Sequence, residues 1–170
     1  FDNINTDLIA GLPTDTPESF KNSLDSIVRL NAECITVHTL CMKRASRLTT
    51  EGVTLDLQQS RDAREMLAYT QNILGQNEYI PYYMYRQSRM VGNLENVGWS
   101  KKGFESLYNV YVMDETHTIL ACGSGGVTKL KRNNPDYLER IFNFKYPYEY
   151  IDRFDELIQR KSGIMQFYGQ

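Results

Sequence analysis

The first part of the chain alternates between short apolar runs and one helical pattern. An apolar run at residues 4–9 ends at a turn and predicts a strand. Residues 16–18 (Thr-Pro-Glu) are a typical helix start, and apolar residues then recur at helical spacing to about residue 30. Residues 34–40 are rich in β-branched side chains and predict a second strand. Strand, helix and strand in this order predict a βαβ unit with two parallel strands and a right-handed crossover.

The rest of the chain is less regular. Asp56 can cap a second helix, which should reach about residue 75. Residues 79–85 predict a strand that Pro81 would confine to a sheet edge, and residues 87–103, which contain three glycines, predict a long loop. The remaining expected elements are a hairpin from 107–113 and 118–122, short strands at 126–130 and 140–144, and one amphipathic helix from 147 to about 167 with Ile151, Phe154, Leu157 and Ile158 on its apolar face.

Composition places the chain among soluble globular proteins, with 41% hydrophobic and 24% charged residues in 170 positions. A formal charge of -2 argues against a dedicated nucleic-acid or membrane-surface binder, and no apolar run approaches the ~18 residues of a membrane span. The three cysteines are an odd number at long spacing, which favours a reducing cytoplasm over a disulfide framework. Because the chain opens at Phe1, almost inside the first strand, we expect it to be a fragment of a longer protein.

Asp7 is the first candidate for a functional role. It comes near the C-terminal end of a predicted parallel strand, where α/β barrels place their ligands. A carboxylate there can accept hydrogen bonds from an amine or a hydroxyl. The alternative is a structural Asp that ties down the following loop.

Two further segments offer groups for an anionic ligand. The turn at 122–126 (Cys-Gly-Ser-Gly-Gly), with Gly125 near its end, could approach a ligand closely and bind a carboxylate or phosphate through backbone N–H groups. A bulged barrel strand explains the same glycines. Lys43, Arg44 and Arg47 follow the second strand and would suit a substrate with several carboxylates, whereas a solvated charged loop is the alternative.

The other chemically capable residues form no recognisable site. His38 lies in an apolar strand and is expected to be a satisfied core histidine, and His117 is expected in a turn. No spacing matches a zinc site, a nucleophile elbow or a phosphate-binding loop, so no metal ligand and no catalytic residue is assigned. The residues alone therefore predict part of an α/β barrel with a polar ligand edge, and they do not define a reaction.

Several stretches together resemble the oxygen-independent coproporphyrinogen III oxidases, a family of radical S-adenosylmethionine enzymes. Residues 5–13 (Asn-Thr-Asp-Leu-Ile-Ala-Gly-Leu-Pro) carry the D-L-I-x-G-L-P segment of that family, and residues 16–20 continue it. The stretches 38–40 with 43–46, 85–87 with 92–98, and 140–144 are similar to its HemZ-like branch of anaerobic coproporphyrinogen dehydrogenases. The resemblance extends over essentially the whole chain.

The resemblance implies a fold, a reaction and two cofactors. The fold class would be α/β: residues 1–78 would form the last βα units of an incomplete (βα)6 radical S-adenosylmethionine barrel, and residues 79–170 an α+β C-terminal extension. The family uses a 4Fe-4S cluster and S-adenosylmethionine to decarboxylate two propionates of coproporphyrinogen III, a tetrapyrrole, to vinyl groups. The products lead to haem, the enzymes are cytoplasmic, and the electron acceptor is not defined by the resemblance.

The family's S-adenosylmethionine contacts fall on Asp7, Cys41 and Val127, with Gly125 in the turn before the last of these. The family's Cys-x3-Cys-x2-Cys cluster loop is absent from the chain, so the chain alone should be inactive. Two other readings stay open: a haem-binding carrier of the same superfamily, and a radical enzyme with another substrate.

Overall fold

The chain forms two compact units, residues 1–106 and 107–170, each with its own sheet. This computed structural model describes residues 1–42, 48, 52, 56–87, 90–132 and 137–169. The family resemblance implied a domain boundary after residue 78, between the last βα units of the barrel and the C-terminal extension. The first compact unit continues beyond that point because the next two strands join the first sheet.

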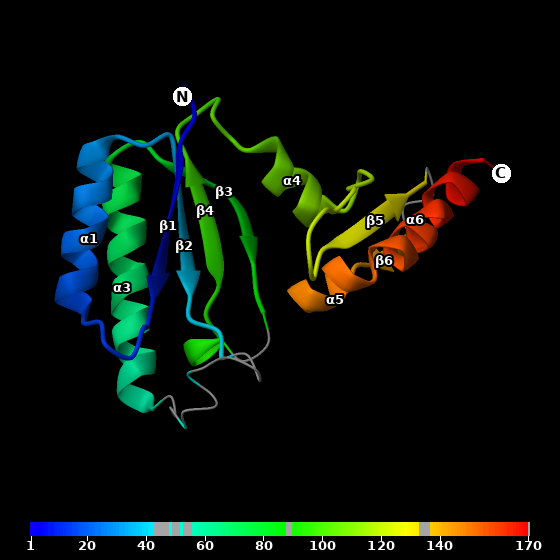
Figure 1. The fold of residues 1–170 in the computed structure, drawn as a ribbon. Helices are drawn as coiled ribbons and strands as arrows, with labels where there is room; N and C mark the ends of the chain where they lie inside the picture. Colours follow the sequence, from blue (N-terminus) through cyan, green and yellow to red (C-terminus); the bar gives the residue numbers. More distant parts are fainter. Residues whose placement is uncertain (43–47, 49–51, 53–55, 88–89, 133–136, 170) are drawn as a thin grey trace. The chain divides into compact units, whose positions relative to one another are not determined.

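The first unit is a four-stranded sheet with two helices on one face (Figure 1). Strand β1 (Asn5–Ala10) is parallel to β2 (Cys34–Thr39), which is antiparallel to β4 (Asn96–Ser100). Strand β3 (Ile80–Tyr85) pairs with β4 at the opposite edge. The helices are α1 (Pro17–Leu30) and α3 (Leu57–Gln76), and a short 3-10 helix, η1 (Val91–Asn93), precedes β4. The predicted parallel strand pair and the edge position of the strand with Pro81 are confirmed.

The core of this unit lies between the sheet and the two helices. Ile35 and Val37 of β2 and Trp99 of β4 are buried against apolar side chains of the helices. The helices contribute Phe20, Leu24, Met66 and Leu74, which recur at helical spacing. Alternate residues of the strands therefore point into the core, and the residues between them point to the other face.

Both long helices start as the sequence predicts. Thr16 accepts a hydrogen bond from the Ser19 backbone N–H, and the Ser19 hydroxyl accepts one from the Thr16 N–H. Asp56 and Gln59 form the same reciprocal pair at the start of α3. Each capping box satisfies two backbone donors that have no partner inside the helix.

Replacing Thr16 by alanine should therefore lower the free energy of unfolding by about 1 kcal/mol, because the Ser19 backbone N–H in the first turn of α1 loses its acceptor. Chemical denaturation followed by circular dichroism measures this loss. Thr14→Ala is the matched control, since Thr14 is exposed and precedes the helix. Equal midpoints for the two variants would contradict the capping role.

The second unit is a two-stranded antiparallel hairpin with three helices. Strands β5 (Val127–Lys131) and β6 (Leu138–Phe142) pair directly, and the helices are α4 (Leu107–Asp114), α5 (Pro147–Asp152) and α6 (Phe154–Tyr168). Its buried apolar residues are Leu130, Phe144, Leu157 and Phe167. The guanidinium groups of Arg153 and Arg160 lie 4.2 and 4.1 Å from the centre of the Phe144 ring, so α6 is fixed partly by stacked cations.

Two expectations for the middle of the chain are wrong. Residues 107–114 form helix α4 instead of a hairpin strand, and of the expected partner strand only Ile119 forms an isolated bridge, to Lys129. No residue of α4 is buried, and a surface helix satisfies its own backbone groups without a neighbouring strand. The expected loop at 87–103 contains β4, whose backbone bonds β2 on one side and β3 on the other.

The C-terminal region also departs from the sequence prediction. The single expected helix is two helices that meet at Arg153, which has non-helical backbone angles (φ -113°, ψ 33°). Leu157 is buried, but the other residues of the expected apolar face, Ile151, Phe154 and Ile158, are exposed. Strand β6 begins two residues earlier than expected, and Phe144 lies beyond it in the core.

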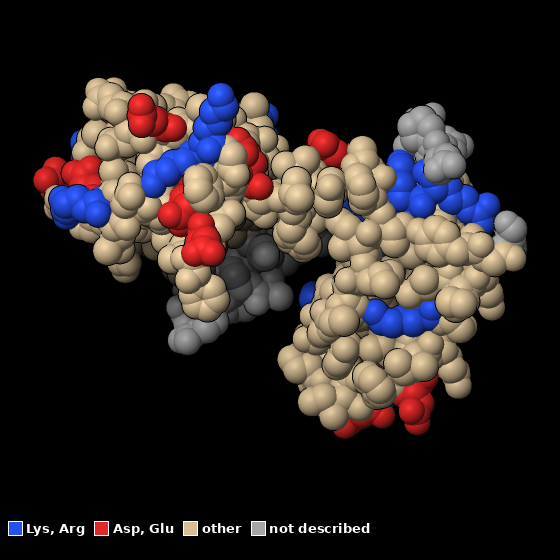
Figure 2. Space-filling model, turned by 90° about the horizontal axis from the view of Figure 1, so that it is seen from above, with Lys and Arg blue, Asp and Glu red and all other residues tan. Residues whose placement is uncertain are grey.

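Charged side chains of both signs are intermixed on the molecular surface seen in Figure 2. Several form exposed ion pairs, including Arg86 with Glu95 and Glu156 with both Arg153 and Arg160. Exposed pairs of this kind contribute at most about 1 kcal/mol each. The stability of the two units therefore rests mainly on their apolar cores.

Candidate functional site

The face of the first sheet that points away from α1 and α3 carries a connected set of polar side chains. Three strands contribute two residues each to this six-residue network: Asn5 and Asp7 from β1, Thr36 and His38 from β2, and Tyr83 and Tyr85 from β3. The residues on β1 and β2 alternate along their strands with residues of the core. The network therefore belongs to the face opposite the helices.

Asp7 is an exposed carboxylate held from one side. Its side chain is 59% exposed. Its Oδ1 accepts a hydrogen bond from Asn5 Nδ2 at 3.0 Å and lies 3.5 Å from His38 Nε2. In the part of the chain that the structure describes, Oδ2 has no partner, so this oxygen is open to a donor from a ligand.

His38 connects Asp7 to β3. The ring is 31% exposed, and its Nδ1 lies 3.4 Å from the Tyr85 hydroxyl. In the tautomer with the proton on Nε2, Tyr85 donates to Nδ1 and the N–H of Nε2 lies on the side of the ring near Asp7. The expectation of a core histidine is therefore wrong: His38 is half-buried and its partners are polar.

Tyr83 closes the network through Thr36. The Thr36 hydroxyl donates to Asn5 Oδ1 at 3.1 Å, and the Tyr83 hydroxyl lies 3.3 Å from the same Thr36 oxygen. Burial raises the pKa of the Tyr83 hydroxyl, so it stays protonated and can donate at neutral pH. Its ring packs over Gly98, which leaves no room for a side chain at that position.

This arrangement is suited to binding a ligand that carries an amine or a hydroxyl. One Asp7 oxygen accepts a hydrogen bond from Asn5 and lies near His38, while the other is open. The charge of the carboxylate strengthens the hydrogen bonds that it accepts. The partners of Asp7 lie on β1 and β2. The alternative role, tying down the loop after β1, has no supporting contact among the described residues.

The other predicted contacts of the first unit lie beyond the end of β2. Cys41 is half-buried and forms an isolated antiparallel bridge with Met90. Lys43, Arg44 and Arg47 lie outside the described residues. Their role in binding the substrate stays a prediction.

Gly125 and Val127 belong to the second unit. Gly125 has a φ of 71°, which favours glycine, and its N–H donates to the Phe144 carbonyl at 2.7 Å. The Gly123 N–H donates to the Tyr150 hydroxyl, and the Gly126 N–H donates to the Gly123 carbonyl. The predicted role of this turn would therefore depend on close backbone approach and not on these three donors. Val127 begins β5.

The described residues contain no group of three His, Cys, Asp or Glu side chains that could hold a metal ion. The three cysteines form no disulfide: Cys34 is buried, Cys41 is half-buried and Cys122 is exposed. Burial raises the pKa of the Cys34 thiol, although a hydrogen bond with Ser100 acts in the opposite direction. Cys34 therefore has the environment of a structural cysteine.

We expect the native protein to show a clear order of thiol reactivity with Ellman's reagent, with Cys122 first and Cys34 last. Cys34 combines burial with a raised pKa, so its reaction should be at least about tenfold slower. Cys122→Ser should remove the fast phase, and unfolding in urea should equalise the three rates. A fast phase that disappears in Cys34→Ser would contradict the assignment.

Sequence reasoning found Asp7 but missed its partners. The alternation of Thr36 and His38 with Ile35 and Val37 in β2 was available as a signal for two different faces. Tyr83 and Tyr85 could not be assigned, because their contact with β2 depends on the pairing of β3 through β4.

A solved structure has the same fold as this chain. Coproporphyrinogen III oxidase (HemN) from Escherichia coli, described as a radical SAM enzyme, has a similar structure with a TM-score of 0.57 at 18% identity. The similarity covers 92% of this chain and 35% of HemN. The predicted fold class is confirmed: the chain is α/β and has part of the radical S-adenosylmethionine fold.

The sequence comparison agrees. The chain is 37% identical over 164 residues to the oxygen-independent coproporphyrinogen-III oxidase-like protein HemZ of Bacillus subtilis (strain 168). The match covers 96% of this chain and 33% of HemZ, so the chain spans about a third of that relative. The chain is thus similar to a third of a relative from the family that its motifs predicted. No protein-family profile matches it, and no helix among the described residues is long and apolar enough to cross a membrane.

Proposed function

We propose that this chain is part of a radical S-adenosylmethionine enzyme of haem biosynthesis. The whole enzyme would decarboxylate two propionates of coproporphyrinogen III oxidatively and release protoporphyrinogen IX in the cytoplasm. The observation that carries the proposal is the open carboxylate of Asp7 on the sheet face opposite the helices, in a chain similar to HemZ over 96% of its length.

The proposed task of the six-residue network is to bind and orient S-adenosylmethionine. Asp7 would accept hydrogen bonds from an amine or hydroxyl of the ligand through its open oxygen, while Asn5 and His38 hold the carboxylate in place. When bound beside a reduced iron-sulfur cluster, S-adenosylmethionine supplies the radical that removes hydrogen from a propionate. Tyr85 and Tyr83 would support the same face through His38 and Thr36.

The described residues do not fit the cluster itself. They contain no group of three potential ligands, and Cys34 is buried in the core of the first unit. The cluster would need ligands supplied by another part of the enzyme. We therefore expect the chain alone to leave S-adenosylmethionine intact.

The substrate should be held partly by the basic segment after β2. Coproporphyrinogen carries four propionates, and the Arg44 guanidinium can bind a carboxylate through two parallel hydrogen bonds. Arg44→Ala in the intact enzyme should lower turnover of the tetrapyrrole about tenfold, a loss of ~1.4 kcal/mol of transition-state stabilisation. Cleavage of S-adenosylmethionine without substrate should continue, and both rates are measured on one preparation. Equal loss of both rates would assign Arg44 to the fold or the cofactor site, and no change would make the segment a solvated surface.

The experiment that tests the proposed function is anaerobic turnover by the intact enzyme with a reconstituted cluster. Coproporphyrinogen III, S-adenosylmethionine and a reductant are supplied, and the porphyrins are separated by chromatography after oxidation in air. The expected product is protoporphyrin. Stoichiometric haem binding without decarboxylation would instead support a haem carrier. If S-adenosylmethionine is cleaved but coproporphyrinogen is not decarboxylated, the enzyme has another substrate.

A further inference from the structure

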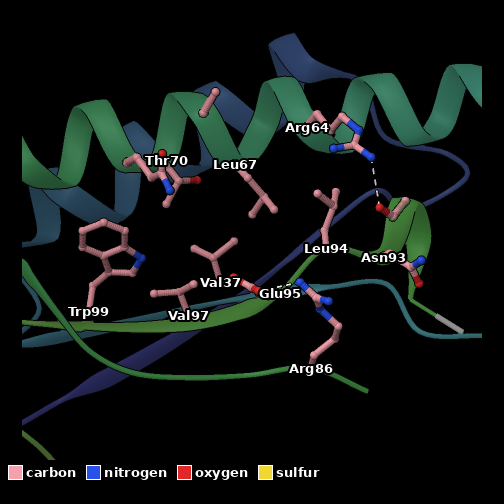
Figure 3. A pocket seen from close by; sticks show the side chains of 13 residues that line it. Val37, Arg64, Leu67, Thr70, Arg86, Asn93, Leu94, Glu95, Val97 and Trp99 are labelled. Carbon is pink, nitrogen blue, oxygen red and sulfur yellow. Dashed lines mark hydrogen bonds and ion pairs between the residues drawn. The ribbon is translucent and has the colours of Figure 1, made fainter. Parts of the chain in front are cut away.

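A cavity of about 600 Å³ lies on the helix side of the first sheet (Figure 3). Val37 of β2, Val97 and Trp99 of β4, and Leu67 of α3 form most of its apolar wall. Val37 alternates with Thr36 and His38 along β2, so the cavity and Asp7 belong to opposite faces of the sheet. Its volume lies in the range of small-molecule sites, which are commonly apolar with a few polar groups that orient the ligand.

One end of the cavity carries an unsatisfied donor. The Trp99 side chain is buried, and its indole N–H has no hydrogen-bond acceptor among the described residues. Figure 3 shows the indole nitrogen on the edge of the ring that is turned toward Leu67 and Val37. A buried donor without an acceptor costs about 1–3 kcal/mol. The nitrogen itself has almost no surface open to solvent, so a small rotation of the ring is needed before a carbonyl oxygen of a bound molecule can accept from it and remove this cost.

The other end of the cavity carries two guanidinium groups. Arg64 of α3 and Arg86, which follows β3, both border the cavity near Leu94, as Figure 3 shows. Arg64 Nη2 donates to the Gly92 carbonyl at 3.1 Å, and Arg86 Nη2 donates to Glu95 Oε1 at 2.6 Å. Each guanidinium has five N–H donors, and these bonds use one from each. Among the described residues that line the cavity, two cations stand against the single carboxylate of Glu95, so the lining of this end has a net positive charge.

We infer that the cavity binds a small acidic molecule with an apolar chain and a carbonyl group distant from its acid. The carboxylate lies at Arg64 and Arg86, the chain lies along Val37, Leu67 and Val97, and the carbonyl accepts from Trp99. This site is independent of the proposed reaction, because it uses the opposite face of the sheet. Arginine can bind a carboxylate through two parallel hydrogen bonds, and for this reason the cavity should prefer acids.

Trp99 is the only tryptophan of the chain, so its fluorescence reports directly on the cavity. The protein is titrated with medium-chain fatty acids, with the same acids carrying a terminal methyl ketone, and with alcohols of equal length. We expect a saturable change in Trp99 emission, about tenfold tighter binding of the acids than of the alcohols, and the tightest binding for an oxo acid. The absence of any saturable change, or equal affinity for acids and alcohols, would overturn the proposal.

Two variants locate the binding groups. Arg86→Gln should weaken binding of the acids about tenfold and leave binding of the alcohols unchanged. Arg29 is an exposed arginine of α1, and Arg29→Gln should change neither affinity. Trp99→Phe, measured by calorimetry, should remove the advantage of oxo acids over plain acids. Asp7→Asn should have no effect. Loss of acid binding in Asp7→Asn, or full binding in Arg86→Gln, would place the ligand elsewhere.

The same titration on the intact enzyme tests whether a protein segment occupies the cavity. Equal affinities in the chain and in the intact enzyme support a small-molecule site. Binding by the chain that disappears in the intact enzyme would show that another part of the polypeptide fills the cavity, which would overturn the proposal.

Discussion

Replacing Asp7 by asparagine should weaken binding of S-adenosylmethionine to the intact enzyme by about tenfold to a hundredfold. The change keeps the size of the side chain but removes the charge that strengthens hydrogen bonds from the ligand, a loss of roughly 1.5–3 kcal/mol. Asp7 is 59% exposed and its Oδ2 has no partner among the described residues, so the fold should tolerate the change. Isothermal titration calorimetry gives the dissociation constant directly.

Asp62→Asn is the matched control for this measurement. Asp62 is a half-buried aspartate of α3, where its carboxylate accepts a hydrogen bond from Gln58, and it lies on a helix and not on the open sheet face. It should leave the dissociation constant unchanged. If both variants bind as tightly as the original enzyme, Asp7 has only a structural role.

Replacing Gly98 by alanine should lower the free energy of unfolding by about 1–3 kcal/mol, the usual cost of overpacking. A Cβ atom at this position would lie 1.8 Å from Cε1 of Tyr83, so the ring would have to move. That movement would also disturb the contact of Tyr83 with Thr36 and its stacking on Tyr85. Chemical denaturation of the chain measures the change.

Gly75→Ala provides the opposite expectation. Gly75 lies in α3, and a Cβ there would meet no atom within 4 Å. Alanine has the higher helix propensity, so this variant should be as stable as the original protein or up to about 1 kcal/mol more stable. If Gly98→Ala were equally harmless, the close packing of Tyr83 on β4 would be contradicted.

Local signals predicted the elements whose start lies in the sequence itself. Thr16 and Asp56 mark helix starts because their side chains bond backbone groups only three residues away. Strand β4 carries no such signal: its glycine lowers β propensity, and the reason for that glycine is the Tyr83 ring of a neighbouring strand. Helix α4 was missed because a short apolar run fits a strand and a helix equally well.

The candidate site shows the same division between local and long-range information. Asp7 could be proposed from its place near the end of a predicted strand, and the family motif supports the same residue. Its connection through His38 to Tyr85 depends on the strand order β1, β2, β4, β3, in which β3 reaches the sheet through the unpredicted β4. The buried donor of Trp99 likewise appears only when β4 is placed against α3.

The most direct test of the proposed function is a crystal structure of the intact enzyme with S-adenosylmethionine bound. We predict that an amine or hydroxyl of the ligand lies within hydrogen-bond distance of Asp7, on the sheet face that carries His38 and Tyr85. A ligand bound elsewhere, with the Asp7 carboxylate in contact only with Asn5 and His38, would contradict the account.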